Sequence, residues 1–222
     1  ISLNGAAVEE LGIMVHPGDA VLFDGKPVQA ERPVYILLNK PKGFITTTDD
    51  DRDRRTVMDL IKAAGTQRVY PVGRLDRQTS GLLLLTNDGA LAEQLMHPRY
   101  EVEKLYAVSL DKPLSERDHA KIEAGLTLDD GPVQVDAVRF PKDDNRKEVG
   151  LAIHSGRNRI VRRIFEHLGY RVVHLDRVIY AGLTKKDLPR GKWRFLQRRE
   201  LNALKHLGMG KKRKGGDQER GA

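Results

Sequence analysis

One short segment of the chain gathers side chains of the kinds that reactive sites use. Residues 73–89 read Gly-Arg-Leu-Asp-Arg-Gln-Thr-Ser-Gly-Leu-Leu-Leu-Leu-Thr-Asn-Asp-Gly. Arg74, Asp76, Arg77 and Thr79 stand together in a predicted turn. Of these, we consider the Asp76 carboxylate as the reactive group.

Two apolar runs flank this turn and predict how Asp76 is positioned. Residues 69–72 lead in and residues 82–85 lead out, and short apolar runs bounded by turn residues are typical of buried strands. Asp76 would then lie on a loop that the core fixes at both ends, where rigid scaffolds present reactive groups. The alternative is that Asp76 only bonds nearby backbone N–H groups. Spacing alone does not decide between the two interpretations.

Composition limits the classes of partner. The 222 residues include 39 Lys+Arg and 31 Asp+Glu, which gives a net charge of +8 and favours a polyanion, either nucleic acid or an anionic membrane surface. No apolar stretch is long enough to span a bilayer. The chain begins at Ile1 rather than Met, so we expect that its true N-terminus is missing.

The sequence predicts neither a metal nor a cofactor. Cysteine is absent, which excludes disulfides and thiolate zinc sites and is compatible with the cytoplasm, where we expect the protein to act. The seven histidines are scattered without metal-ligand spacing. Neither a phosphate-binding P-loop nor a dinucleotide-binding glycine motif is present.

Element patterns predict an α+β fold, because strands and helices mix without a strict βαβ rhythm. We predict strands over residues 35–38, 44–48, 105–110, 133–140, 148–154 and 171–180. We predict helices over residues 56–64, 90–96, 115–124, 160–168 and 200–207. We expect residues 29–33 to form a linker, residues 34–207 the main domain, and residues 208–222 a basic disordered tail.

Four further segments lie in the same order and at similar spacing as in a known family. They are residues 39–43 (Asn-Lys-Pro-Lys-Gly), 103–108, 157–169 and 191–194. Together with residues 73–89, they resemble the pseudouridine synthases, in particular the ribosomal family whose type member modifies small-subunit rRNA. The resemblance covers roughly residues 35–204. It implies a mixed, largely antiparallel sheet with flanking helices and a central basic cleft.

The N-terminal residues carry a second, shorter resemblance. Residues 1–30 resemble the C-terminal part of the S-four-type RNA-binding module that often precedes this catalytic domain. The helix pair of that module would come before Ile1, so the RNA-binding role of such a remnant is open. The alternative is a hairpin that packs on the main domain.

The resemblance implies a reaction that needs no cofactor. The bond between ribose and uracil nitrogen breaks, the base rotates, and it rejoins through carbon 5. Asp76 matches the family's catalytic Asp, a nucleophile or a base at the sugar, and Tyr106 matches an active-site Tyr that can stack on a flipped-out uracil. Arg162 matches the basic partner of the Asp. Periodicity does not choose between Arg162 and Arg163, which flank the apolar helix face on opposite sides.

Other residues of the matched segments are candidates for RNA binding. Arginines at a helix start suit phosphate recognition, although Ile160 stands where the family commonly has Gln. Lys40 is either structural or RNA-facing. The full set of RNA-binding candidates is Lys40, Arg74, Arg77, Thr79, Arg157, Asn158, Arg159 and Arg163.

The leading hypothesis is therefore an isomerase that converts a uridine of ribosomal RNA, with the large-subunit RNA favoured and the assembling ribosomal subunit as a further partner. The runner-up is a non-catalytic RNA-binding ribosome assembly factor on the same fold. A carboxylate facing a polyanion speaks against it, because binding alone does not need one. A third hypothesis is a glycosidic-bond hydrolase, but such enzymes usually pair two carboxylates and the matched motifs show no obvious second one.

Overall fold

The computed structural model describes residues 1–10, 12–16, 18–28, 31–142 and 145–207. The chain divides into two compact units, Ile1–Pro33 and a larger one that begins at Val34. The predicted tail over residues 208–222 lies outside the described residues, as do positions 29 and 30 of the predicted linker.

The smaller unit is a four-stranded antiparallel sheet with the order β2-β1-β3-β4. Its strands are β1 (Ser2–Leu3), β2 (Ala6–Ala7), β3 (Val21–Phe23) and β4 (Lys26–Pro27). Asn4 and Gly5 connect β1 and β2 with φ angles of 52° and 88°, which a two-residue hairpin turn of this type requires. The S-four-type origin of this unit stays a prediction.

The larger unit is built, over its described residues, around a nine-stranded sheet. The path is β11-β12-β8-β13-β7-β5-β15, with β14 paired to β13 and β6 paired to β7. These strands are β5 (Tyr35–Lys40), β6 (Tyr70–Pro71), β7 (Ser80–Thr86), β8 (Lys104–Leu110), β11 (Ala137–Arg139), β12 (Glu148–Ile153), β13 (Val172–Tyr180), β14 (Leu183–Thr184) and β15 (Trp193–Phe195). The pairs are antiparallel except β13 with β7, so the sheet is mixed and largely antiparallel as expected.

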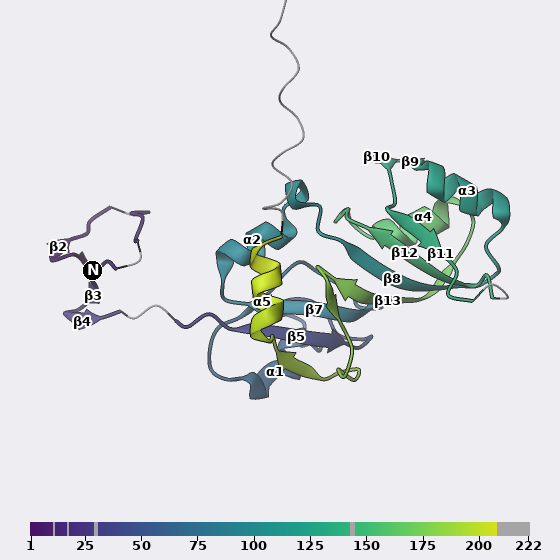
Figure 1. Ribbon diagram of the computed structural model, residues 1–222. Helices are drawn as coiled ribbons and strands as arrows, with labels where there is room; N and C mark the ends of the chain where they lie inside the picture. The colour runs from purple at the N-terminus through teal and green to yellow at the C-terminus, as the bar shows by residue number, and fades with distance from the viewer. Residues whose placement is uncertain (11, 17, 29–30, 143–144, 208–222) are drawn as a thin grey trace, which may run out of the picture. The chain divides into compact units, whose positions relative to one another are not determined.

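Helices cover both faces of the strand pair β5 and β7 (Figure 1). Alternate residues of these strands enter two different cores, as the period of a strand requires. Leu37 and Leu84 pack with α2 (Gly89–Met96) and α5 (Arg198–Lys205). Leu38 and Leu83 pack with α1 (Val57–Ile61), which the short helix η1 (Lys62–Ala64) continues. Both strands are buried along their whole length.

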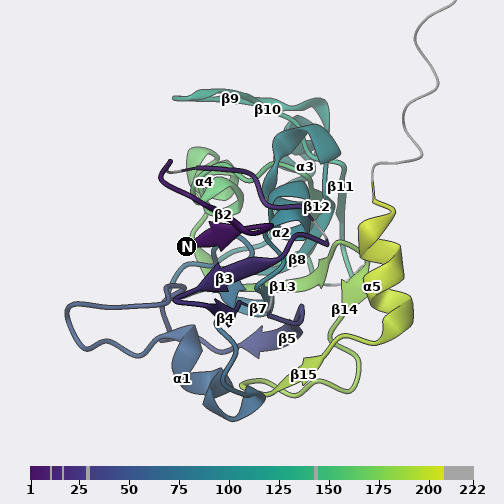
Figure 2. The same cartoon turned by 90° about the vertical axis from the view of Figure 1, so that its left-hand side faces the viewer.

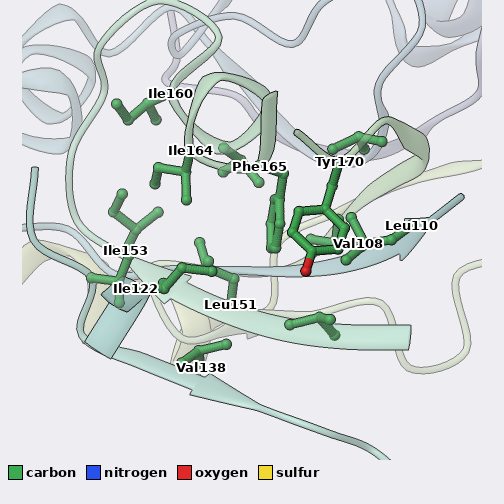
Figure 3. Packing of buried hydrophobic residues seen from close by; sticks show 14 of the residues in the cluster. Val108, Leu110, Ile122, Val138, Leu151, Ile153, Ile160, Ile164, Phe165 and Tyr170 are labelled. Carbon is green, nitrogen blue, oxygen red and sulfur yellow. The ribbon is translucent and has the colours of Figure 1, made fainter. Parts of the chain in front are cut away.

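At the other end of the sheet, α3 (Glu116–Ala124) and α4 (Ile160–His167) pack on β8, β11, β12 and β13. Figure 3 shows Ile164 and Phe165 pointing from α4 toward Leu151 and Val108 of the sheet. The apolar face predicted for this helix is therefore confirmed. The hairpin of β9 (Leu126–Leu128) and β10 (Gly131–Val133) lies beside α4 (Figure 2). A short helix, η2 (Pro98–Tyr100), leads into β8.

Two predicted strands are wrong. Residues 44–48 form only an isolated bridge between Ile45 and Thr56, in which the Ile45 backbone bonds those of Arg55 and Val57 and not a neighbouring strand of the sheet. The strand predicted over residues 133–140 is split, since β10 ends at Val133 and β11 covers only Ala137–Arg139. No helix in the described ranges is both long and apolar enough to cross a membrane.

The parallel pairing of β7 with β13 requires glycine at position 81. Gly81 lies opposite Arg177 with a φ of +113°, and a Cβ built on it would meet the Arg177 backbone oxygen at 2.3 Å. We expect Gly81→Ala to lower the free energy of unfolding by about 3 kcal/mol through overpacking and backbone strain. Urea denaturation followed by circular dichroism measures this change.

The matched control is Gly150→Ala in β12, where the nearest atom to an added Cβ would be the Arg139 oxygen at 3.6 Å, an ordinary contact. Equal stability of the two variants would contradict the close approach at Gly81.

Candidate active site

A cavity of about 430 Å³ opens in the larger unit at the segment around Asp76. Five stretches of chain form its wall: the loop before β7, the end of α2, the strand β8, the segment that leads into α4, and the strand β13. Its polar and charged lining residues are Arg74, Asp76, Thr79, Lys104, Tyr106, Ser155, Arg157, Asn158, Arg159, Arg177 and Tyr180.

The loop that carries Asp76 is held through its backbone by Lys40. The Lys40 side chain is fully buried, and its ammonium donates to the carbonyl oxygens of Asp76 at 3.0 Å and Thr79 at 2.8 Å. A third hydrogen bond, of 3.3 Å, goes to the Pro41 oxygen. Within the loop, the Thr79 N–H donates to the Asp76 oxygen at 3.0 Å. The Asp76 backbone is thereby fixed while its side chain remains 37% exposed.

Further contacts fix the rest of this loop. The Thr46 hydroxyl donates to the Leu75 oxygen at 2.8 Å and accepts from its N–H at 3.3 Å. The Gly43 N–H donates to the Arg77 oxygen at 2.8 Å. The Gly73 N–H lies 3.1 Å from the sulfur of Met96 on α2. The loop is consequently bonded at positions both before and after Asp76.

The floor of the cavity consists of side chains from the paired strands β8 and β13. Tyr106 lies opposite Arg177, and Lys104 lies opposite Tyr180. Lys104 donates to the oxygens of Val102 at 2.9 Å and His154 at 2.7 Å. Burial, reinforced by the charge of Arg177, lowers the pKa of Lys104 to about 8. Burial also raises the pKa of Tyr180.

Arg159 is the basic residue that approaches Asp76. Its Nη1 lies 3.7 Å from Asp76 Oδ2, and its Nη2 lies 3.4 Å from Glu166 on α4. The Arg159 backbone caps α4 with a φ of 47°, which places its side chain over the cavity wall. Because both side chains are about half exposed, this ion pair adds little to the stability of the fold, and its main effect is to keep the two side chains close together.

Arg162 is buried and donates to backbone oxygens. Its Nη1 bonds the Val172 oxygen at 3.0 Å, and its Nη2 lies 3.4 Å from the Gln78 oxygen. Burial and the charge of Arg159 lower the pKa of Arg162, whereas the charge of Asp76 opposes this shift. Through its contact with the Gln78 oxygen, Arg162 therefore helps to hold the loop that carries Asp76.

Two other arginines are bound by the β9–β10 hairpin. Arg157 donates to Asp130 at 3.1 Å and to the Pro132 oxygen at 2.7 Å. Arg163 donates to Asp130 at 2.8 Å and pairs with Asp129 as well. The two guanidinium groups hold the pKa of Asp130 well below its usual range. The hairpin thus anchors the segment that carries Asn158 and Arg159.

The cavity is strongly basic. Among the described residues that line it, Asp76 supplies the one carboxylate, and five side chains are basic: Arg74, Lys104, Arg157, Arg159 and Arg177. Surrounding positive charge attracts a polyanion.

Comparisons with known proteins agree with this geometry. Residues 34–167 match the family model described as RNA pseudouridylate synthase. Over 210 residues the chain is 41% identical to the ribosomal large subunit pseudouridine synthase B of Bacillus subtilis (strain 168), with 93% of this chain and 86% of that protein covered. It is 40% identical over 215 residues to an uncharacterized RNA pseudouridine synthase of Mycobacterium leprae (strain TN), with 94% and 84% covered. The chain belongs to the RNA pseudouridylate synthase family. It is therefore an isomerase that acts on RNA.

The fold agrees with this family too. A solved crystal structure of pseudouridylate synthase matches the chain with a TM-score of 0.71 and 29% identity, over 91% of this chain and 87% of that one. The pseudouridine synthase fold expected from the sequence motifs is thereby confirmed.

The structure brings most of the sequence-predicted site residues of this pseudouridine synthase to one cavity. Those that line it are Arg74, Asp76, Thr79, Tyr106, Arg157, Asn158 and Arg159. Asp76 and Tyr106 are 30 positions apart in the chain, and the sheet places both at the same cavity. Their catalytic and RNA-binding roles stay predictions.

Four predicted site residues do not line the cavity. Lys40 is not RNA-facing, since its ammonium is buried against the loop carbonyls. In the described structure Arg159 forms the ion pair with Asp76, while Arg162 bonds backbone oxygens, so the predicted pairing of Arg162 with Asp76 stays a prediction. Arg163 is bound by the hairpin carboxylates. Arg77 is exposed beside the cavity, with its Nε 3.4 Å from the Gly43 oxygen.

Sequence reasoning missed three polar residues of the cavity floor: Lys104, Arg177 and Tyr180. Lys104 precedes Tyr106 by two positions, and residues two apart on a strand share a face, so its place could have been predicted. For Arg177 the sequence gives only a weaker indication of a site residue, namely a charged side chain within a strand of mostly apolar residues. No cluster of three potential metal ligands occurs within the described part of the chain.

We expect Lys40→Met to slow pseudouridine formation by about 100-fold, because a displacement of Asp76 by about 1 Å has an effect of that size. Single-turnover assays at saturating RNA measure the rate. The matched control is Lys42→Met, two residues along the same turn, where the partly exposed side chain contacts His174 and not the loop. A Lys40→Met enzyme as fast as this control would contradict the role of the ammonium.

The buried ammonium also predicts a pH dependence of stability. Burial, partly offset by the charge of Asp76, lowers the pKa of Lys40 from 10.5 to about 8. Between these two pH values the unfolded chain holds more protons on Lys40 than the folded protein, so this group makes the free energy of unfolding rise with pH. Below pH 8 both states are protonated, and the contribution is constant.

We therefore expect the free energy of unfolding of wild type, minus that of Lys40→Met, to increase by up to about 3 kcal/mol from pH 7.5 to pH 10.5. Urea titrations at several pH values give this difference. A difference that stays flat over this window would show that Lys40 keeps an ordinary pKa in the fold, and a difference that falls would show that the fold raises it.

Proposed function

We propose that this enzyme converts a specific uridine of large-subunit ribosomal RNA into pseudouridine, with Asp76 acting as nucleophile or base at the sugar. The observation that supports the proposal is the cavity in which Asp76 lies with Tyr106 among five basic side chains. The named relative from Bacillus subtilis, a ribosomal large subunit pseudouridine synthase, favours this RNA.

The geometry suits the steps of the isomerisation. The Asp76 side chain is accessible while its backbone is fixed, so a ribose can approach a carboxylate of defined position. Tyr106 on the cavity floor offers a ring on which a flipped-out uracil can stack. The exposed Arg74 and Arg159 at the same cavity suit RNA phosphates.

We further propose that the enzyme meets this RNA in the cytoplasm, on the assembling ribosomal subunit. Residues 34–207 would form the catalytic domain, and residues 1–30 would be the remnant of an S-four-type module. The net charge of +8 supports binding to a polyanion, which predicts that RNA affinity falls steeply with added salt.

Incubating rRNA transcripts of both subunits with wild type and with Asp76→Asn tests the function. Carbodiimide modification followed by primer extension then maps pseudouridine. We expect one new stop in the large-subunit RNA with wild type, and a rate at least about 1,000-fold lower with Asp76→Asn. Binding of the RNA should persist in Asp76→Asn, because a carboxylate facing a polyanion has been removed.

The control variant is Glu123→Gln, which neutralises a half-exposed carboxylate of α3 that does not line the cavity. RNA binding without any new stop, on transcripts and on assembling subunits alike, would favour a non-catalytic assembly factor. A stop in the small-subunit RNA alone would correct the substrate.

A further inference from the structure

Arg177 occupies a buried position on the floor of the cavity. Its residue surface is 3% exposed, and it lines the same cavity as Asp76. Its Nε donates to the Leu82 oxygen at 2.8 Å, and its guanidinium carbon lies 4.3 Å from the centroid of the Tyr180 ring. These two contacts fix the plane of the guanidinium group.

One end of this guanidinium is unpaired. Within the part of the chain that the structure describes, the buried Nη2 of Arg177 has no hydrogen-bond partner. The same holds for the hydroxyl of Thr79, which is 2% exposed and lines the same cavity. An unpaired buried donor costs about 1–3 kcal/mol, and more when charged, so its presence calls for an explanation. Because both residues line the cavity, a polar ligand bound there is the explanation that we develop.

The charges of the floor indicate that this ligand is electron-rich. Lys104 and Arg177 both donate to backbone oxygens rather than to carboxylates. The positive charge of Arg177 disfavours that of Lys104, since it helps burial to lower the pKa of Lys104. A ligand that carries negative charge would relieve this repulsion.

The reaction creates such a ligand. When the bond between ribose carbon 1′ and uracil nitrogen 1 breaks, the electron pair stays on the base and spreads over nitrogen 1 and the two carbonyl oxygens. Rotation about the axis through nitrogen 3 and carbon 6 exchanges nitrogen 1 with carbon 5, and oxygen 2 with oxygen 4. Carbon 5 then bonds to the sugar, and its proton leaves for nitrogen 1. A fixed donor beside one carbonyl therefore meets a carbonyl both before and after the rotation.

We propose that Nη2 of Arg177 donates a hydrogen bond to a carbonyl oxygen of the target uracil and stabilises the detached base in both of its orientations. This inference rests on the proposed function, because the uracil is detached only if the enzyme forms pseudouridine. Arg177 is then a catalytic residue that selects a pyrimidine with carbonyl groups at positions 2 and 4.

The first test compares Arg177→Lys and Arg177→Met with wild type on large-subunit rRNA transcripts that carry tritium at carbon 5 of uridine. Loss of a hydrogen bond to a charged group predicts a fall of about 10- to 100-fold in the maximal single-turnover rate of tritium release. The RNA concentration for half saturation should change by less than about twofold. An unchanged maximal rate, or a loss confined to RNA affinity as for a phosphate contact, would overturn the proposal.

The matched control is Arg146→Lys. Arg146 also has a buried Nη2 without a partner among the described residues, but it does not line the cavity. We expect this variant to retain the wild-type rate. A fall in Arg146→Lys equal to that in Arg177→Lys would mean that the effect is one of folding, and would also count against the proposal.

A second measurement separates this inference from the proposed function. Absence of tritium release by wild type from rRNA would overturn the proposed function. Arg177 is then tested directly in the wild-type protein, by nuclear magnetic resonance of isotope-labelled arginine side chains during titration with uridine 5′-monophosphate. We expect the guanidinium resonance that is missing in Arg177→Lys to shift with the nucleotide but not with inorganic phosphate. No shift, or an equal shift with phosphate, would overturn the inference whatever the RNA result.

Discussion

The hydrogen bonds from the Lys40 ammonium to the loop that carries Asp76 are the constraint on which the site depends. Lys40 ends a strand that is buried along its whole length, so the sheet itself sets the position of the ammonium. Because that ammonium binds the backbone oxygens of Asp76 and Thr79, the loop is held in a fixed position relative to the sheet. A carboxylate on a solvent-facing loop would otherwise move with the loop. The protein thereby presents an accessible side chain on a rigid backbone.

The parallel pair of β7 and β13 joins the two halves of the larger unit. One half has its own cores around β5 and β7, and the other has a core around β8, β12 and α4. The cavity draws its walls from both halves, with Asp76 before β7 and Arg177 on β13. Gly81 allows the two strands to approach at that point. The relative placement of the reactive carboxylate and the cationic floor therefore depends on a single strand pairing.

Local sequence patterns predicted the helices and strands, but not which side chains from different elements bind one another. The apolar run after Asp76 and the helical period of residues 160–168 placed these segments correctly, because both signals arise within a few residues. The run before Asp76, predicted as a buried strand, forms only the two-residue strand β6 with Tyr70 exposed. Lys40 was ambiguous, since its burial depends on oxygens 36 and 39 positions further along the chain. The carboxylates of the β9–β10 hairpin that bind Arg163 lie more than 30 positions away in the sequence. Local spacing therefore gave no sign of them, and Arg163 was predicted to bind RNA. Which of Arg159 and Arg162 forms the ion pair with Asp76 likewise depends on where each side chain extends in the fold, which residue spacing does not predict.

The order of segments around the cavity has a consequence for when the site forms. Its lining residues lie within 72–79, 95–96, 104–106, 155–161 and 175–180, so the cavity is complete only when the chain has been made as far as β13. The pairing of Arg177 with Gly81 joins positions 96 residues apart, and contacts at such separation form late because closing a long loop is entropically unfavourable. A nascent chain still lacking β13 would expose the basic loop of Asp76 without the floor that completes the site. We therefore expect the cavity to form late in folding, and an incomplete chain would carry the positive charge of the Asp76 loop without the floor of the proposed site.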